Sequence, residues 1–332
     1  MIFHMNGQEK THKKRILITG ATGYLGAHLV IKLKRDNIVY GLCRKRPKDK
    51  SILGIPKRNI IVGDLSQTKT YTELSNYNFN IIIHLVSLDH KKSETTPKKV
   101  IDVNVLPTLQ LLDYFSNNGL EKFINFTALQ VLGQLNPIKI TDTYEPNPQN
   151  KYGLTHLLSE KVVNYYNHTT DVNCINVRLA SGYGSPVFVD NNCWWLVVMD
   201  FCRTAINNKI IKLLSDGSPQ RDFIHITDIC NAVGILVSSN PDNLKYDNYN
   251  LGYGKTYTIL ELAHKVSQIY RKRYNKECPV ILGNGNISSN PSSISKDPKF
   301  EYDIHRLFDI GFKPAVELNQ GINEIFNYLD NL

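Results

Sequence analysis

The sequence lacks paired cysteines and long hydrophobic runs. Its six cysteines are scattered singly, without the close spacing of a structural zinc site, and this pattern also argues against a disulfide framework. The apolar run at residues 194–199 is far shorter than the ~20 residues that a membrane helix needs. Residues 1–14 are polar and have no apolar core, so they indicate a frayed tail rather than a signal peptide. We expect a cytoplasmic protein with no metal site and no membrane partner.

Charge is plentiful, but it is dispersed along the chain. The 332 residues include 39 lysines and arginines against 30 acids, a net charge of +9, and 42% of the residues are hydrophobic. This balance is typical of a folded chain with one large domain or two closely packed ones. The basic clusters at residues 13–15, 44–46 and 91–92 lie in different segments, without a continuous basic helix. The charge therefore favours a solvated basic surface or an anionic small-molecule partner over nucleic acid.

Strand and helix patterns alternate through the first half of the chain. Short apolar runs indicate strands, and apolar residues at every third or fourth position indicate helices. Strands are expected at residues 15–19, 37–43, 59–62, 81–83, 122–127 and 174–179, and helices at 24–34, 69–76, 100–117 and 152–166. This alternation predicts an α/β fold, a doubly wound parallel sheet of the Rossmann type with helices on both faces.

A glycine-rich turn lies between the first expected strand and the first expected helix. Residues 17–26 read LITGATGYLG, with Gly20, Gly23 and Gly26 three positions apart. In a dinucleotide-binding turn, successive glycines permit the bend, admit the pyrophosphate and let the helix pack on the strand. The start of the helix then offers free N–H groups to the phosphates. The motif predicts a dinucleotide site, and the alternative is a structural turn without a ligand.

The pattern changes after about residue 180, where glycine, proline, asparagine and aromatic residues become frequent. We expect a dinucleotide-binding Rossmann domain at residues 12–180, with its sheet completed by part of 223–252. A smaller substrate-binding domain is expected at residues 181–332. Residues 1–11 are expected to form a disordered tail.

The spacing of the three glycines resembles that of the extended short-chain dehydrogenase/reductases. It is most similar to their NAD-dependent epimerase/dehydratase branch, which modifies nucleotide-diphosphate sugars. The resemblance extends from about residue 15 to residue 314, and the order of its segments is more specific than any one motif. After the glycine turn these segments are residues 63–65 (GDL), 84–87 (HLVS), 104–108 (NVLPT), 131–133 (VLG), 152–160 (YGLTHLLSE), 217–228 (GSPQRDFIHITD), 251–254 (LGYG) and 260–263 (LELA).

The resemblance implies a nicotinamide dinucleotide as the cofactor. Asp64 would meet the adenine amino group, and the strand end at residues 84–87 would lie beneath the cofactor. The residues implied at the cofactor are Gly20, Thr22, Gly23, Tyr24, Leu25, Gly26, Arg44, Asp64, Leu65, Leu85, Val86, Asn104, Tyr152 and His156.

The end of the second expected strand bears on the choice between NAD and NADP. An acid there would bind the ribose hydroxyl of NAD, whereas a basic residue accommodates the 2′-phosphate of NADP. Residues 43–46 read CRKR, and no acid follows until Asp49. Arg44 therefore favours NADP, and NAD is the alternative.

The catalytic positions depart from the family pattern. In the family, a tyrosine exchanges a proton with the sugar hydroxyl, a lysine four residues later lowers the tyrosine pKa, and a serine or threonine assists. Here Tyr152 is present, but His156 stands at the lysine position and Ala128 at the assisting position. A histidine is only fractionally charged at pH 7, so it favours the phenolate less than lysine does. The resemblance implies Tyr152 and His156 as the catalytic pair, with Thr127 or a water replacing the missing hydroxyl.

The resemblance also implies a nucleotide-diphosphate sugar as the partner. Arg221 would clamp the diphosphate, because a guanidinium matches the geometry of phosphate oxygens. Ala128, Ser181 and Cys193 would lie at the sugar. Sugar dehydratases of the family have an Asp-Glu pair where residues 129–130 are Leu-Gln, so dehydration is not expected.

Two functions remain open from the sequence. The first is an NAD(P)-dependent epimerase, or a C4 dehydrogenase or reductase, of a nucleotide-diphosphate sugar, with Tyr152 as acid and base. The second is a non-catalytic dinucleotide-binding protein, regulatory or RNA-associated, and the residues at positions 128 and 156 favour it. By resemblance, we expect a homodimer formed through the helices at 100–117 and 152–166.

Overall fold

The structure is a computed structural model, and it describes residues 13–47, 49, 51–135, 139–288 and 298–332. The tail expected at residues 1–11 lies outside the described residues. No helix in these ranges is long and apolar enough to cross a membrane.

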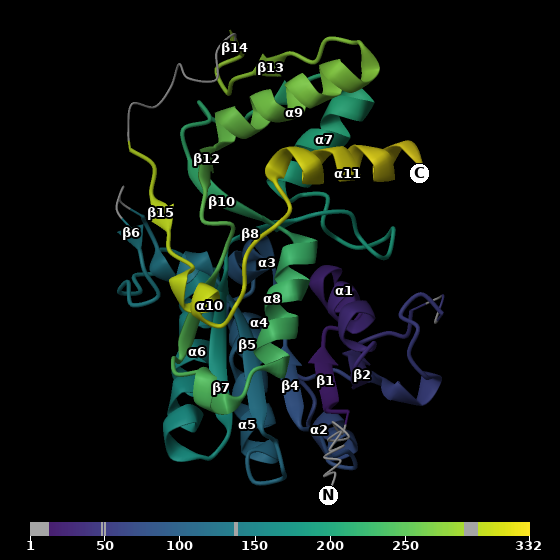
Figure 1. Cartoon of the computed structure of the whole chain (residues 1–332), viewed down its shortest axis with the longest axis vertical. Helices are drawn as coiled ribbons and strands as arrows, with labels where there is room; N and C mark the ends of the chain where they lie inside the picture. Colours follow the sequence, from purple (N-terminus) through teal and green to yellow (C-terminus); the bar gives the residue numbers. More distant parts are fainter. Residues whose placement is uncertain (1–12, 48, 50, 136–138, 289–297) are drawn as a thin grey trace, which may run out of the picture.

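The large sheet has seven strands in the order β11-β7-β5-β4-β1-β2-β3 (Figure 1). All six neighbouring pairs are parallel. The strands are β1 Arg15–Thr19, β2 Ile38–Cys43, β3 Ile60–Val62, β4 Ile81–His84, β5 Lys122–Ala128, β7 Asn173–Leu179 and β11 Asn248–Leu251. The predicted fold class, a doubly wound parallel sheet with helices on both faces, is confirmed.

Helices cover both faces of this sheet because its strands are apolar on both sides. On β1, Ile16 and Ile18 belong to one apolar core and Leu17 to another, and all three are fully buried. The first core packs against α1 and α8, and the second against α2, α5 and α6. The bounds of these helices are α1 Tyr24–Leu33, α2 Thr68–Leu74, α5 Leu106–Phe115, α6 Lys151–Thr169 and α8 Ile226–Ser238.

The helix expected at residues 100–117 is two helices. The first is α4 Pro97–Asn104, and α5 follows after a break at Val105. The proline at position 107 lies in the first turn of α5, where its missing N–H does no harm. The same proline inside one continuous helix would remove a hydrogen bond, so the prediction of one helix was wrong.

The chain after residue 180 builds a second apolar core and also returns to the first. The second core lies around α7, α9 and α11, at the top of Figure 1. In contrast, α8 packs on α1, and β11 pairs with β7 at the edge of the large sheet. The remaining elements are η1 Lys57–Asn59, α3 His90–Thr95, η2 Leu129–Leu132, β6 Lys139–Ile140, β8 Ser181–Tyr183, α7 Val197–Asn208, β9 Ile211–Lys212, β10 Gln220–His225, η3 Pro241–Asn243, β12 Thr256–Thr258, α9 Ile259–Tyr274, β13 Val280–Ile281, β14 Ile287–Ser288, β15 Glu301–Tyr302, α10 His305–Asp309 and α11 Leu318–Asp330.

Candidate active site

The glycine turn connects β1 to α1 in a tight bend. Gly20 has a φ of +70°, in the left-handed region, and its carbonyl accepts a hydrogen bond of 2.8 Å from the Gly23 amide. A Cβ atom on Gly26 would overlap the carbonyl oxygen of Gly20, so the helix packs this closely only with glycine there. Gly23 is the N-cap of α1, and no side chain among the described residues caps the helix. The first N–H groups of α1 are therefore left for an anion, which fits the predicted dinucleotide phosphates.

Residues far along the chain form hydrogen bonds with this bend. The Tyr24 hydroxyl donates to the Gly184 carbonyl at 2.7 Å, and the Asn191 amide donates to the Thr22 carbonyl at 2.9 Å. Tyr24 thus has a structural contact beyond the cofactor contact predicted for it. No local sequence signal could have identified Asn191, because its partner lies 169 positions away.

Tyr152 and His156 meet at the start of α6. Asn150 caps this helix by accepting a hydrogen bond from the Gly153 amide. The two rings lie edge to face, with centroids 4.5 Å apart and an interplanar angle of 75°. His156 is buried, and His90 on the other side of Tyr152 has its ring centroid 6.0 Å away. The sequence prediction that residues 152 and 156 share one helix face agrees with this contact.

The environment of this pair favours its uncharged forms. Burial, with a smaller effect from the Asp89 carboxylate, raises the pKa of Tyr152 to about 12. Burial lowers the pKa of His156 to about 4. His156 is therefore a neutral imidazole at pH 7 and gives Tyr152 no positive charge.

Two ring nitrogens at this end of the sheet have no partner in the part of the protein that the structure describes. His84, at the end of β4, shares a hydrogen bond of 2.9 Å between its Nδ1 and the Thr19 hydroxyl. The Nε2 atoms of His84 and His156 are both buried without a hydrogen-bond partner among the described residues. Since buried polar atoms are almost always paired, such atoms indicate a polar ligand or water. Leu85 and Val86 follow His84 directly and lie nearest to Gly20, and His84 is close enough to His156 for their charges to interact, so these nitrogens and the glycine bend belong to one end of the sheet.

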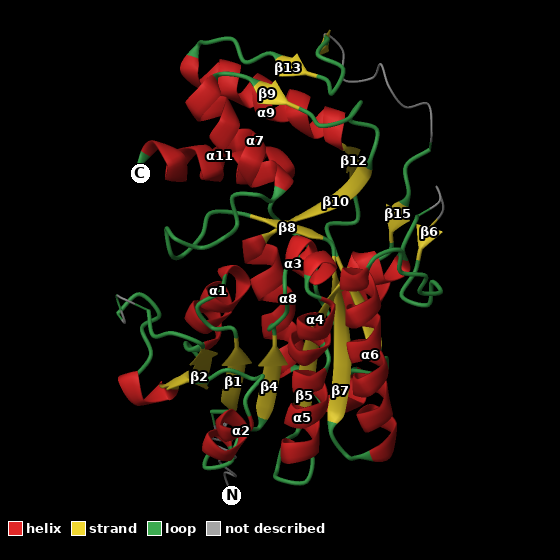
Figure 2. Cartoon of the chain, turned by 180° about the vertical axis from the view of Figure 1, so that it is seen from behind, coloured by secondary structure: helices red, strands yellow, loops and turns green. Residues whose placement is uncertain are grey.

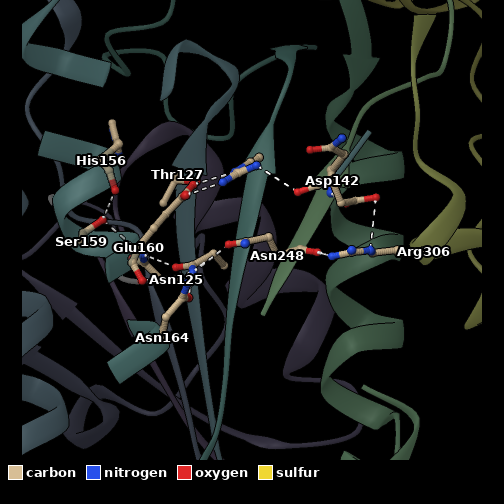
Figure 3. A network of polar contacts seen from close by, with 12 residues as sticks. Asn125, Thr127, Asp142, His156, Ser159, Glu160, Asn164, Asn248 and Arg306 are labelled. Carbon is tan, nitrogen blue, oxygen red and sulfur yellow. Dashed lines mark hydrogen bonds and ion pairs between the residues drawn. The ribbon is translucent and has the colours of Figure 1, made fainter. Parts of the chain in front are cut away.

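Thr127 is engaged away from Tyr152. Its hydroxyl donates to Glu160 Oε1 at 2.7 Å, and Glu160 forms a buried ion pair with Arg178 at 2.7 Å (Figure 3). The Thr127 hydroxyl is thus occupied by Glu160, and the assisting role predicted for it stays a prediction. Ala128 is buried and supplies no hydroxyl.

Asn104 uses both ends of its amide within the protein. Its Oδ1 accepts from the Leu88 amide at 2.7 Å, and its Nδ2 donates to the Thr155 hydroxyl at 2.9 Å. It thereby connects the loop after β4 to α6 next to His156. The structure gives Asn104 a positioning contact, and the cofactor contact predicted for it stays a prediction.

Arg44 and Asp64 lie near one another at the carboxyl ends of β2 and β3. Arg44 is exposed and directly follows β2. A hydrogen bond from the Ser66 amide chiefly lowers the pKa of Asp64, and the Arg44 charge lowers it further. Leu65 is buried behind them. The base and the acid predicted for the adenosine half of the cofactor therefore share one neighbourhood.

Apart from Ala128, the residues predicted for the sugar and its diphosphate are spread over the C-terminal half. Arg221 is exposed on β10, and its Nη1 donates to the Gln220 carbonyl. Ser181 is half-buried on β8, next to the same strand. Cys193 is packed in the second apolar core, and burial raises the pKa of its thiol to about 11; the sugar contact predicted for it stays a prediction. Asp222 braces the turn after β11, because its carboxylate accepts three backbone N–H groups.

Comparisons with known proteins identify the family of the chain. A sequence model described as NAD dependent epimerase/dehydratase family matches residues 16–252. The UDP-glucose 4-epimerase of Dictyostelium discoideum is 26% identical, over 85% of this chain and 88% of its own length. The dTDP-L-rhamnose 4-epimerase of Burkholderia thailandensis is 24% identical, over 95% of both chains. The fold is similar to that of the UDP-N-acetylglucosamine 4-epimerase of Methanobrevibacter ruminantium, solved with UDP-N-acetylmuramic acid, with a TM-score of 0.78, 20% identity and coverage of 96% and 99% of the two chains. The chain therefore belongs to the NAD-dependent epimerase/dehydratase family.

Proposed function

We propose that the chain binds a nicotinamide dinucleotide in the glycine bend and oxidises or reduces C4 of a nucleotide-diphosphate sugar. Tyr152 would be the acid and base. The observation that carries the proposal is the contact of the Tyr152 and His156 rings, one helical turn apart, at the same end of the sheet as the glycine bend. The unpaired Nε2 atoms of His84 and His156 support it, because a ribose hydroxyl or an amide would satisfy them.

The proton step depends on the charge of Tyr152. When bound, a nicotinamide supplies the exchange of hydride with the sugar carbon. Tyr152 would take the proton of the C4 hydroxyl on oxidation and return it on reduction. With a pKa of about 12, only a small fraction of Tyr152 is phenolate near pH 7. We therefore expect a slow enzyme whose oxidation rate rises with pH.

We propose that NADP binds more tightly than NAD. The exposed guanidinium of Arg44 stands where β2 ends, which is the position that meets the adenosine ribose in this fold. A phosphate on that ribose would gain a charge-assisted contact. Asp64, nearby, would remain free to accept a hydrogen bond from the adenine amino group.

We propose that the protein recognises its substrate by a nucleotide-diphosphate group. Arg221 on β10 is exposed, and its bond to the adjacent Gln220 carbonyl uses only one of its five N–H donors among the described contacts. The names of the relatives, which include UDP- and dTDP-sugar epimerases, support the same class of substrate. Epimerisation and simple C4 oxidation or reduction share the same half-reaction, and the proposal covers both.

A second candidate is dinucleotide binding without turnover, in a regulatory role. The observation that favours it is the loss of both groups that assist the tyrosine. Ala128 offers no hydroxyl, and burial keeps His156 uncharged. The fold and the glycine bend would then hold the cofactor, while Tyr152 stayed protonated.

One experiment separates the two candidates. The purified chain is loaded with NADP or NAD and mixed in turn with UDP-, GDP-, dTDP- and CDP-sugars at pH 7 and pH 9.5, while absorbance at the reduced-nicotinamide band is followed. The enzyme proposal expects a sugar-dependent change that is faster at pH 9.5. Cofactor binding without any such change at either pH would favour the non-catalytic candidate.

A further inference from the structure

Three lysines surround the ring of Tyr257 on β12. The Nζ atoms of Lys255, Lys265 and Lys299 lie 5.5, 5.4 and 5.7 Å from the ring centroid. Lys255 lies just before β12, Lys265 on α9 and Lys299 just before β15, so the fold brings them together from three places. Cations at this distance are attracted by the face of an aromatic ring.

Negative charge does not balance this cluster. Glu261 forms an ion pair with Lys299 at 2.6 Å. Within the described ranges, neither Lys255 nor Lys265 lies within ion-pair distance of an acid. The three ammonium groups share one ring and repel one another, and this repulsion is relieved when an anion binds among them.

The cluster continues the position proposed for the diphosphate. Arg221 on β10 pairs directly with Tyr257 on β12 in an antiparallel ladder, so their side chains leave the same face of the small sheet. Lys255 directly precedes β12, and its Nζ atom over the Tyr257 ring places it beside that face. Arg221 and Lys255 are both exposed. Among the described ion pairs, these four cations make one, that of Lys299 with Glu261, so they carry more positive charge than a diphosphate alone neutralises.

We infer that the cluster of Lys255, Tyr257, Lys265 and Lys299 binds an anionic group that the substrate carries in addition to its diphosphate. The group is a phosphate or a carboxylate, and the ligand is a nucleotide-diphosphate sugar with at least one further negative charge. The inference rests on the proposed function, because it takes Arg221 as the diphosphate clamp. The lysines would then select the more highly charged member of this substrate class.

Binding of inorganic polyphosphates to the full chain tests the inference without cofactor or turnover. Calorimetry compares pyrophosphate with tripolyphosphate for the unaltered chain, for Lys255→Gln/Lys265→Gln and for the control Lys272→Gln/Lys276→Gln. The control removes two exposed lysines at the far end of α9 and just beyond it, with the same change in net charge. We expect tripolyphosphate to bind at least about fivefold more tightly than pyrophosphate, and only Lys255→Gln/Lys265→Gln to reduce this advantage below about twofold.

The outcomes distinguish the inference from the proposal beneath it. The inference would be overturned if the control variant lost the preference for tripolyphosphate to the same extent, or if Lys255→Gln/Lys265→Gln kept that preference. In either case, loss of pyrophosphate binding in Arg221→Gln would leave the diphosphate clamp standing. Tighter binding of single-stranded RNA than of tripolyphosphate, lost in the same double variant, would overturn it in favour of a nucleic-acid surface.

A second comparison locates the additional charge. If the unaltered chain binds UDP-glucuronic acid more tightly than UDP-glucose, and Lys255→Gln/Lys265→Gln binds the two equally, the anion is a carboxylate on the sugar. If the double variant binds tripolyphosphate more weakly but its affinities for the two sugar nucleotides change equally, the anion belongs to the nucleoside side.

Discussion

The imidazole of His156 stands edge-on to the phenol of Tyr152, with 4.5 Å between the ring centroids, where the family has a lysine. The contact keeps the geometry of the pair but removes its charge, because burial lowers the pKa of His156 to about 4. Tyr152 therefore lacks the electrostatic help that a fixed cation gives a general base.

Replacing Tyr152 with phenylalanine should lower the sugar-dependent rate at least about 100-fold and leave the dissociation constant of the cofactor nearly unchanged. In the proposed mechanism the phenol moves the proton, whereas the glycine bend binds the phosphates. Stopped-flow absorbance and a cofactor titration measure the two quantities. Tyr165→Phe, at an exposed position on the same helix, is the control. An unaltered rate in Tyr152→Phe would remove Tyr152 from its assigned role.

Replacing His156 with lysine should move the alkaline rise of the rate to lower pH. An ammonium beside the phenol favours the phenolate, and each unit by which it lowers the Tyr152 pKa increases the phenolate fraction about tenfold. The pH profile of kcat from pH 6 to 10 is the measurement. His156→Gln removes the imidazole without adding charge and should not move the profile.

Adding Ala128→Ser to His156→Lys should raise the rate again, by about tenfold, because it restores the hydroxyl that assists the proton transfer. A double variant no faster than the unaltered chain at pH 7 would mean that the substrate does not reach Tyr152, and it would favour the non-catalytic candidate.

Replacing Arg44 with glutamine should weaken NADP binding about tenfold and change NAD binding by less than twofold. The loss corresponds to one charge-assisted hydrogen bond to the 2′-phosphate. Fluorescence titration with the two reduced cofactors measures both affinities. Arg35→Gln, which removes an exposed arginine beyond the end of α1, is the control. Equally weakened binding of both cofactors would show that Arg44 does not distinguish a ribose with a 2′-phosphate from one without it.

Asp142 should make folding stability fall as pH rises from 4 to 7. Burial raises its pKa to about 6, although a hydrogen bond from the Asn250 amide opposes the change. The folded state therefore holds the proton more tightly than the unfolded state, whose aspartate pKa is about 3.9. This contribution is fully present below about pH 3.9 and is lost as the pH rises through about 6.

The variant Asp142→Asn isolates that contribution. Relative to the unaltered chain, it should gain on the order of 3 kcal/mol of unfolding free energy between pH 4 and pH 7. Urea unfolding at the two pH values provides the comparison, with the exposed Asp171→Asn as control. A difference between the two chains that does not change with pH would contradict the assignment.

The helices α4 and α5, which follow one another end to end beside α6 on one face of the sheet in Figure 2, should form a homodimer interface together with α6. They expose apolar side chains to solvent, and such patches on helices commonly pair with a second copy. These residues are Ile101, Leu106, Leu109, Leu154, Leu158 and Tyr165. Sedimentation velocity should show a dimer for the unaltered chain and a monomer for Leu109→Glu/Leu158→Glu. Phe308→Glu, an exposed apolar position on α10, should remain a dimer.

Local sequence was sufficient for much of the fold. The apolar run at residues 16–18 is buried on both sides of β1, as parallel strands require, and the glycines at 20, 23 and 26 form the bend that their spacing predicts. The prediction of one helix at 100–117 was wrong, because the helical spacing of apolar residues continues across Val105 although the helix itself is interrupted there. A proline at position 107 was the available signal.

The partners of polar side chains were beyond the reach of sequence patterns. Thr127 was adjacent to the expected hydroxyl position, yet Glu160 is its partner, 33 positions away. Asn104 matched a family segment, but its amide connects Leu88 to Thr155. Such contacts are decided by how strands and helices pack, and single-sequence reasoning does not resolve that packing.

The pairing of β11 with β7 has a consequence for synthesis on the ribosome. A nascent chain that has emerged only through β7 presents that strand with one edge open, because its neighbour on that side is Asn248–Leu251. The open edge would persist until the later strand leaves the exit tunnel, and an open edge is a template for pairing with other chains. This stage of translation is where chaperones would be needed most.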